Sequence, residues 1–589
     1  MIEFRVDADQ PKAHLFGITL NVPQPRALQR VSLPVWIPGS YLVREFARHL
    51  SRLQAWQGKR ECRVEQIDKN SWQVHCEGPA ALRLRYEVYA FDPSVRAAYL
   101  DSQRGFFNGT SLFLRVEGRE SDAHRLRIGA LPRGWQVATS MPASPDSTPA
   151  HAVHECADYA ALVDHPVALG TFWRGQFELR GVPHGFVVTG ALPSFDGERL
   201  LADTRRICEA QVRFWHGRGK PPVDRYLFML QAVEDGYGGL EHRNSTALIA
   251  ARRDLPRRTP DRTTDRTTDR SSETSDGYVK LLGLVSHEYF HTWNVKRLMP
   301  REFETIDFER ENYTRLLWFF EGFTSYYDDL MLLRCGLIDA KRYLQLLGRT
   351  VHGVLATPGR LLQSVADASF DAWVKYYRGD ETTPNATISY YTKGSLVALA
   401  LDLHLRASSS NCLDDVMRLL WQRAAGGPID EGDIAQALHT VAGRSLDTQL
   451  RDWVHGTGEL PLEPLLADVG VQLLRDACPL ADELGLRLSE GPFSGVQVKS
   501  VLRGGVAEQA GVSPGDELLA IDGWRMRRLD EARNWLDKGQ PFDLLLVRDQ
   551  RVLSLRLVPR SDTPHTLSLR LAEQAAPDVQ ARRRAWLGV

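Results

Sequence analysis

The chain has 589 residues, of which 43% are hydrophobic and 25% charged, and its formal net charge is -1 at pH 7. This length predicts about three or four domains, and the composition is that of a globular protein rather than a disordered or fibrous one. The neutral charge balance argues against nucleic acid as the main partner, and no apolar run approaches the length of a membrane span.

The start of the chain carries charges where a secretory signal peptide needs an apolar core. The seven cysteines are odd in number, widely scattered and free of any C-x-x-C pair, so we expect reduced thiols rather than disulfides. Both features predict a protein of the cytoplasm.

Residues 1–170 alternate apolar and polar positions in short runs, such as 18–22 and 82–88, separated by Pro and Gly turns. This period predicts an N-terminal β-sandwich domain. A helical period at 198–215 and a strand at 225–230 then begin a second domain, which we expect to be catalytic and to extend over residues 171–470.

Residues 251–277 are polar and repetitive, with D-R-T-T-D-R-T-T-D-R at 261–270. Such a segment cannot bury a core, so we expect a disordered insertion at the surface. A regulatory lid is the alternative, because the segment directly precedes the most informative helix of the chain.

That helix carries His287, Glu288 and His291 in the pattern H-E-x-x-H, after an apolar run at helical spacing and an N-cap signal at 275–277. The two histidines are four residues apart and therefore lie on one face, where both can bind one ion. Glu288 lies one step further round, where it can hold a water molecule as general base without binding the metal. The pattern predicts a zinc hydrolase with one zinc per chain.

A second helix is predicted at 313–327, apolar nearly all round and therefore buried. A carboxylate inside such a helix is costly unless it is paired or bound to metal, so Glu321 is the expected third ligand. The imidazole and carboxylate set would also accept cobalt or manganese.

Residues 287–294, H-E-Y-F-H-T-W-N, and 318–323, W-F-F-E-G-F, resemble the glycyl aminopeptidase family of thermolysin-like zinc metallopeptidases. W-I-P-G-S-Y at 36–41 and G-G-L-E-H-R-N-S at 238–245 extend the resemblance over most of residues 1–560. It implies a catalytic domain with a thermolysin-like α/β part and a helical part, and an aminopeptidase that removes small N-terminal residues such as glycine or alanine.

An aminopeptidase must bind a free α-ammonium, for which a carboxylate is the best partner. Glu241 fits this requirement, because it follows Gly238 and Gly239, at which the backbone can approach a substrate closely. Related enzymes have G-A-M-E-N or G-G-M-E-H here, whereas this chain has Leu240 and His242.

The segment Y-T-K-G at 391–394 resembles the one that supplies a phenol donor in related aminopeptidases. Tyr391 is therefore expected to stabilise the oxyanion of the tetrahedral intermediate. Tyr390 is its neighbour, but adjacent helical positions point about 100° apart, so only one should face the zinc. Further helices are expected at 395–405, 414–423, 433–441 and 446–454.

Residues 471–562 resemble a PDZ domain, with strand patterns at 495–498 and 515–523 around a short helix at 507–512. Leu484, Gly485 and Leu486 occupy the place of the loop that binds a peptide's terminal carboxylate. Binding of peptide C-termini and a purely structural packing role are both open for this domain. The tail, 563–589, is polar and basic and should be solvated or helical.

The chain is thus predicted to be a multidomain α+β protein that hydrolyses peptide substrates with free N-termini. One alternative is a zinc endopeptidase or carboxypeptidase-like hydrolase in which Glu241 binds no ammonium. Blocking the substrate's amino terminus separates the two, since an endopeptidase should still cut. The other alternative is a peptide-binding PDZ scaffold with a structural zinc.

Overall fold

The computed structural model describes residues 1–148, 152–258, 274–491, 494–560 and 564–588. The chain forms two compact units, one of residues 1–313 with 335–337 and 424–429, and one of residues 314–334, 338–423 and 430–589. The centre of the insertion predicted at 251–277 lies outside the described residues. Its start forms a 3-10 helix, Arg252–Asp254, and its end enters the helix α4.

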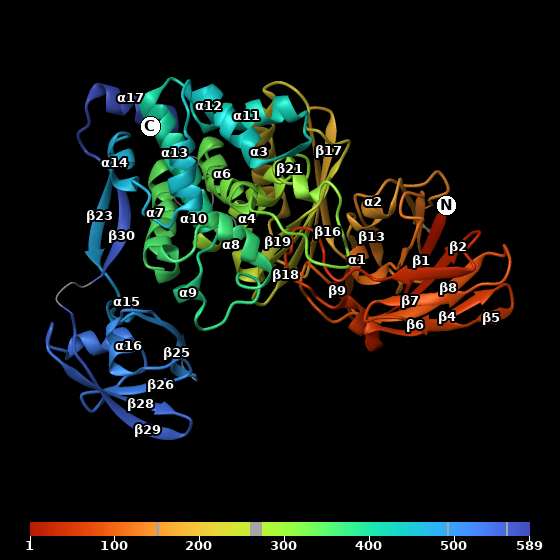
Figure 1. Ribbon diagram of the computed structural model, residues 1–589, viewed down its shortest axis with the longest axis horizontal. Coiled ribbons are helices and arrows are strands. Elements are labelled where there is room, and N and C mark those ends of the chain that lie inside the picture. Colours follow the sequence, from red (N-terminus) through yellow and green to blue (C-terminus); the bar gives the residue numbers. More distant parts are fainter. Residues whose placement is uncertain (149–151, 259–273, 492–493, 561–563, 589) are drawn as a thin grey trace. The chain divides into compact units, whose positions relative to one another are not determined.

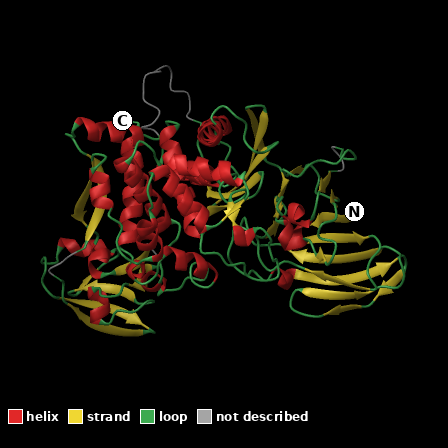
Figure 2. Ribbon diagram, turned by 45° about the horizontal axis from the view of Figure 1, so that its top comes forward, coloured by secondary structure: helices red, strands yellow, loops and turns green. Residues whose placement is uncertain are grey.

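The N-terminal part of the first unit is built from three sheets, and the labelled N-terminus in Figure 2 lies in this strand-rich region. The first sheet has the order β14 (Val153–Cys156), β12 (His124–Ile128), β1 (Ile2–Gln10), β2 (Leu15–Val22), β8 (Leu82–Tyr89), β4 (Leu50–Gln57) and β5 (Arg60–Cys62). The second has the order β13 (Gln136–Ala138), β15 (Val167–Gly170), β10 (Arg104–Phe107) and β9 (Ala98–Leu100), and the third β11 (Arg115–Val116), β3 (Leu28–Ser32), β7 (Ser71–His75) and β6 (Val64–Gln66).

A single core joins these sheets, because the buried side chains of one sheet pack against those of the others. In β1, for example, Ile2, Phe4 and Val6 are buried while the residues between them are partly or fully exposed. Such alternation is what a strand with one solvated face requires. The strand periods in the sequence therefore predicted this β-rich domain correctly.

A five-stranded mixed sheet follows, and its last strand is decisive for the site. Its order is β16 (Trp173–Leu179), β17 (Val182–Thr189), β18 (Tyr226–Val233), β20 (Ser245–Ala251) and β19 (Tyr237–Glu241). β17, β18 and β20 are parallel, and β19 is antiparallel to β20. β18 is buried along nearly its whole length, as expected of a strand covered on both faces. β19 is an edge strand, and β16 forms the opposite edge.

Two helices pack beside this sheet. α3 (Gly197–His216) connects β17 to β18, and the side chain of its N-cap Asp196 accepts a hydrogen bond from the backbone of Arg199. α4 (Asp276–Phe290) begins at the predicted N-cap, where Ser275 accepts a hydrogen bond from the backbone N–H of Tyr278 at 3.2 Å. Both caps satisfy a backbone donor that the helix itself cannot.

The second unit is mainly helical in its first part (Figure 1). Its longer helices are α6 (Gly322–Arg334), α7 (Ala340–Leu355), α10 (Thr392–Ser408), α11 (Leu413–Ala424) and α12 (Glu431–Ala442). The helix predicted at 313–327 starts later, ends later and is interrupted: it begins as α5 (Leu317–Phe320), and α6 starts after Glu321 and continues to Arg334. The apolar pattern alone did not reveal this break.

The C-terminal part of the second unit holds the PDZ fold. Its sheet has the order β24 (Leu486–Gly491), β25 (Gly495–Val501), β26 (Glu517–Ile521), β28 (Phe542–Arg548) and β29 (Arg551–Leu557), with β27 (Trp524–Arg525) beside β26. The short helix α16 (Val506–Ala510) lies where the sequence predicted one. A separate pair, β23 (Val471–Ala477) and β30 (His565–Leu571), flanks this sheet in sequence, and α17 (Pro577–Leu587) ends the chain as a helix.

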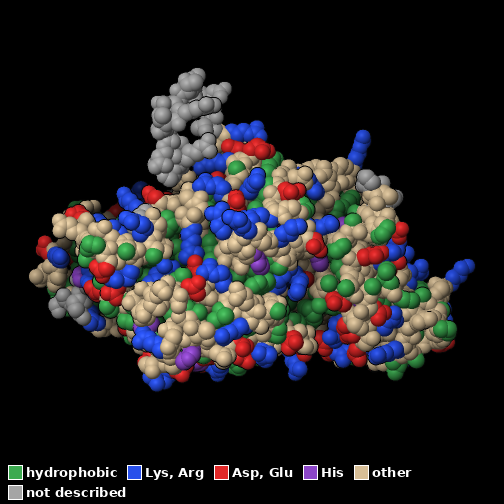
Figure 3. Space-filling view, turned by 90° about the horizontal axis from the view of Figure 1, so that it is seen from above, with side chains coloured by type: hydrophobic (Ala, Val, Ile, Leu, Met, Phe, Trp, Pro, Cys, Tyr) green, Lys and Arg blue, Asp and Glu red, His purple; other side chains and the backbone are tan. Residues whose placement is uncertain are grey.

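The surface is of mixed charge. On the face shown in Figure 3, basic and acidic side chains are interspersed, as the formal net charge of -1 leads one to expect. Within the ranges that the structure describes, no helix combines the length and the apolar character that crossing a membrane requires.

Candidate active site

α4 presents the H-E-x-x-H pattern at its C-terminal end, where the helix gives way to a turn. The rings of His287 and His291 lie close together, with centroids 4.7 Å apart. Nδ1 of His291 donates a hydrogen bond to the backbone oxygen of Asn294 at 2.7 Å, so Nε2 is the ring nitrogen that could act as the metal ligand. The four-residue spacing has therefore brought both imidazoles together at the end of α4.

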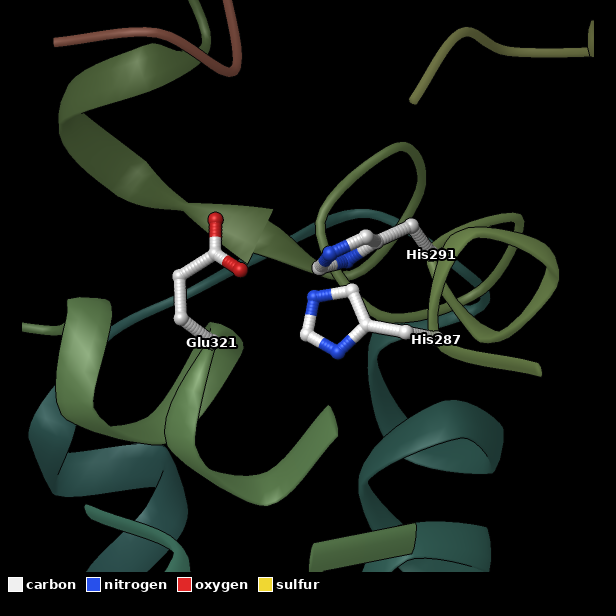
Figure 4. Close-up of side chains that lie close together, drawn as sticks. All are labelled: His287, His291 and Glu321. Atoms are coloured by element: carbon white, nitrogen blue, oxygen red, sulfur yellow. The ribbon is translucent and has the colours of Figure 1, made fainter. Parts of the chain in front are cut away.

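Glu321 lies with these two histidines. One ligand atom of each of the three residues lies within 4.8 Å of the others, and Figure 4 shows the carboxylate and the two rings pointing toward one another. Glu321 and His291 are almost fully buried, at 2% and 1% exposure. Two imidazoles and one carboxylate are a ligand set of catalytic zinc, with one position left for water or substrate, so this donor set fits zinc.

Glu288 is buried next to the edge strand β19. One of its carboxylate oxygens, Oε2, accepts a hydrogen bond from the hydroxyl of Thr246 on β20 at 3.3 Å. Gly239 lies directly against the same side chain, because a β-carbon at this glycine would come within 2.6 Å of Glu288 Cγ and still closer to the carboxylate. The absence of a side chain at Gly239 is therefore what allows Glu288 to contact the edge strand.

Glu241 ends the same strand, and its side chain is only 5% exposed. Gly39, in the W-I-P-G-S-Y segment, packs closely against the carboxylate of Glu241. A β-carbon on Gly39 would be only 2.5 Å from Glu241 Oε1. Gly39 has φ +90, a backbone conformation that glycine adopts readily. Both residues line a cavity of about 350 Å³ with the apolar side chains Met299, Phe303 and Phe308.

Tyr391 immediately precedes α10 and lies near Glu321. α10 and α6 meet at two glycines, because a β-carbon at Gly394 would be 3.0 Å from Gly322 Cα, and one at Gly322 would be 2.6 Å from Gly394 Cα. Burial is the main cause that raises the pKa of Tyr391 well above its ordinary value, and the negative charge of Glu321 is the second cause. The phenol therefore keeps its proton and can donate a hydrogen bond.

A buried ionic network next to Glu241 was missed in the sequence. Asp164 accepts hydrogen bonds from Lys296 Nζ at 2.9 Å and from the backbone N–H of Arg243 at 2.8 Å, and His242 Nδ1 lies 3.3 Å away. Burial raises the pKa of Asp164, but Lys296 and His242 outweigh it and hold that pKa well below its usual range. His242, the residue at the position for which the sequence left the role open, is thus hydrogen-bonded to Asp164.

The loop predicted to bind a peptide carboxylate lies between a short helix and a strand. Leu484 ends the short helix α15 (Leu480–Leu484), Gly485 has the left-handed conformation, and Leu486 begins β24. β24 is an edge strand of its sheet, so one side of its backbone is not paired by another strand of that sheet.

Comparisons with known proteins agree with this architecture. Residues 3–171 match the family model of the Peptidase M61 N-terminal domain, residues 280–397 that of the M61 glycyl aminopeptidase, and residues 497–548 that of a PDZ domain. A search of curated proteins finds no match.

Among solved structures, the chain is similar to an aminopeptidase N family protein from Idiomarina loihiensis, with 34% identity and a TM-score of 0.91 over 100% of both chains. It also matches an M1 zinc metallopeptidase from Deinococcus radiodurans, with 15% identity and a TM-score of 0.46 over 78% of this chain and 94% of that one. The first similarity extends over every domain described above. This chain accordingly belongs to the M61 glycyl aminopeptidase family and is a zinc aminopeptidase that carries a C-terminal PDZ domain.

Proposed function

We propose that this enzyme hydrolyses the first peptide bond of substrates with a free amino terminus and prefers a small first residue, glycine or alanine. The observation that carries the proposal is the buried carboxylate of Glu241, two residues along β19 from the glycine that contacts Glu288. A carboxylate confined beside the reacting groups is suited to bind an ammonium. The preference for small residues is supported by the family's description and by Gly39, which leaves no space on one side of Glu241.

The chemistry follows from the proposed metal ligands and from further groups of the chain around them. His287, His291 and Glu321 would hold one zinc ion per chain, which would act as a Lewis acid that polarises a carbonyl and lowers the pKa of a bound water to about 7. Glu288 accepts the proton of the attacking water as general base, while the hydroxyl of Thr246 orients its carboxylate.

Tyr391 donates its proton in a hydrogen bond to the oxygen on which negative charge develops. Glu241 holds the ammonium and thereby fixes which peptide bond meets Glu288. The backbone of Gly238 and Gly239, on the edge strand, lies alongside the substrate, as it does when an extended peptide adds to a sheet.

The test compares alanyl and glycyl p-nitroanilides with N-acetylated peptides, using the full-length zinc enzyme. Glu288→Gln should retain about one zinc per chain and lose several orders of magnitude in kcat, because the general base is gone. Glu241→Gln should lose activity chiefly on substrates with a free amine. Undiminished cleavage of acetylated peptides by the wild type would instead support a zinc endopeptidase.

Larger apolar first residues are the second candidate, which the cavity of about 350 Å³ beside Glu241 favours. Leucyl and phenylalanyl anilides in the same assay decide between the two. A kcat/KM higher for these than for the alanyl substrate would assign the cavity to the side chain of the first residue and contradict the preference for small ones.

We also propose that the PDZ domain binds peptide C-termini, at the loop of Leu484, Gly485 and Leu486 beside the edge strand β24. Titration of the full-length protein with short peptides, each as free acid and as amide, tests this. We expect selective binding of the acid, and we expect Gly485→Trp to abolish it because the larger side chain shields the loop.

We place the enzyme in the cytoplasm, which its seven free cysteines support.

A further inference from the structure

Arg96 lies beside the edge strand β19. Its Nη2 donates a hydrogen bond to the backbone oxygen of Gly239 at 3.0 Å. Its Nε is buried and has no hydrogen-bond partner, and no ion pair to Arg96 is found among the described residues. A guanidinium carries five donors in a planar fork that matches a carboxylate, so this side chain retains donors for a second group.

The place of Arg96 along the strand follows from two glycines. Gly239 contacts Glu288, and a β-carbon at Gly238, one residue earlier, would lie 3.5 Å from Arg96 Nη1. Glu241 lies at the other end of the strand. A substrate whose ammonium is held at Glu241 and whose reacting bond faces Glu288 must therefore run opposite to β19, toward Gly238 and Arg96.

The distance along the strand limits the length of that substrate. Each residue of an extended chain advances by about 3.3 Å, so the residue that follows the reacting bond lies beside Gly238. If this residue is the last of the peptide, its terminal carboxylate comes next to the guanidinium of Arg96. Longer peptides would carry an uncharged amide at the same place.

The other charges at this end of the strand do not compete for such a carboxylate. The Nζ of Lys280 lies over the ring of Tyr237, 4.1 Å from its centroid. The carboxylate of Asp235, which precedes the strand, is paired with Arg253 at 2.8 Å. Lys280 thus contacts a side chain of β19, whereas Arg96 is the cation among these groups that hydrogen-bonds to the backbone of the strand.

We propose that Arg96 binds the terminal carboxylate of the residue after the scissile bond, so that the preferred substrates are dipeptides with a free C-terminus. This inference rests on the proposed function, because it uses the substrate direction set by Glu241 and Glu288. An acidic side chain at the same substrate position would offer the same chemistry, and the experiment separates the two sources.

The experiment measures kcat/KM of the full-length zinc enzyme on Ala-Ala, Ala-Ala-amide and Ala-Asp-amide. The wild type should prefer Ala-Ala to its amide, and Arg96→Gln should reduce that ratio by about 10- to 100-fold, the range expected for a charge-assisted hydrogen bond. Arg96→Lys should keep part of the ratio, because it keeps the charge but not the fork.

Arg174→Gln is the matched control. Arg174, on the opposite edge strand β16, also donates to a backbone oxygen, that of Val137 at 3.3 Å, so the control removes a comparable charge and hydrogen bond away from β19. It should leave the ratio of acid to amide unchanged. Equal losses on acid and amide in Arg96→Gln would show that Arg96 only anchors β19 and would overturn the proposal. An Arg96-dependent preference for Ala-Asp-amide over Ala-Ala would also overturn it, since the carboxylate bound would then be a side chain.

Binding separates this inference from the proposed function. Calorimetric titration of Glu288→Gln with Ala-Ala and Ala-Ala-amide should give tighter binding of the acid, and adding Arg96→Gln should abolish the difference. Such binding without turnover of any substrate by the wild type would contradict the proposed function and leave the role of Arg96 intact. Aminopeptidase activity with equal binding of acid and amide would instead support the proposed function and contradict the role of Arg96.

Discussion

Gly239→Ala tests whether the contact between β19 and Glu288 sets the rate of the reaction. The added methyl group would lie 2.6 Å from Glu288 Cγ and closer still to the carboxylate, whereas ordinary contact begins at 3.4 Å. The Glu288 side chain must therefore move by about 1 Å or more, and a displacement of this size costs on the order of 10²-fold in rate when it misplaces a reacting group. The backbone conformation is not an obstacle, because Gly239 does not have a positive φ.

The assay is kcat on an alanyl anilide, with zinc content and the thermal unfolding midpoint measured on the same preparation. We expect a loss of about 100-fold in kcat with zinc retained, since the three atoms nearest to the new methyl group all belong to Glu288, which is not one of the proposed ligands. Gly353→Ala on α7 is the control, because nothing lies within 4 Å of its added β-carbon. A Gly239→Ala enzyme that folds, holds zinc and keeps most of its kcat would refute the assignment of Glu288 as the general base.

Three further predictions concern the phenol donor, the metal and the pH dependence of stability. Tyr391→Phe should lower kcat by about 10²- to 10³-fold with little change in KM, whereas Tyr390→Phe should not; similar losses in both would remove Tyr391 from the oxyanion site. A chelator should abolish activity, and zinc or cobalt should restore it, as assayed after dialysis. Burial lowers the pKa of His184 to about 4, from 6.5 for an unperturbed imidazole. The unfolded chain then binds a proton that the folded chain does not, so stability is full above about pH 6.5 and declines by about 3 kcal/mol as the pH falls to about 4. Urea unfolding at pH 7.5 and 5 should show this decline and a smaller one in His184→Gln; equal declines would contradict it.

The lowered pKa of His184 matters for the site because this residue supports α4. Its Nδ1 donates to the backbone oxygen of Val182 at 3.0 Å, and its Nε2 accepts from the hydroxyl of Tyr289 at 2.9 Å. Tyr289 lies within the H-E-x-x-H pattern, between the two histidines. Protonation of His184 would remove the acceptor that holds this tyrosine, so the loss of stability at low pH should begin near the metal site.

The sequence by itself determined the features that depend on neighbours close along the chain. The spacing of His287 and His291 puts both rings on one face of any helix, Ser275 begins that helix, and alternation in β1 predicts a half-buried strand. The sequence also singled out Glu321, because a carboxylate is costly in an apolar helix unless it is bound, and the structure places it with the two histidines.

Only the tertiary structure decided which distant segments meet. The break between α5 and α6 was hidden by a continuous apolar pattern, and no local signal indicated that Gly39 packs against Glu241 or that Asp164 engages His242. Arg96 lies 143 positions from Gly239 along the chain, yet it hydrogen-bonds to the strand on which the substrate would lie. Hydrogen bonds of this kind depend on the packing of whole sheets, since residue spacing constrains only neighbours within a turn of helix or along one strand.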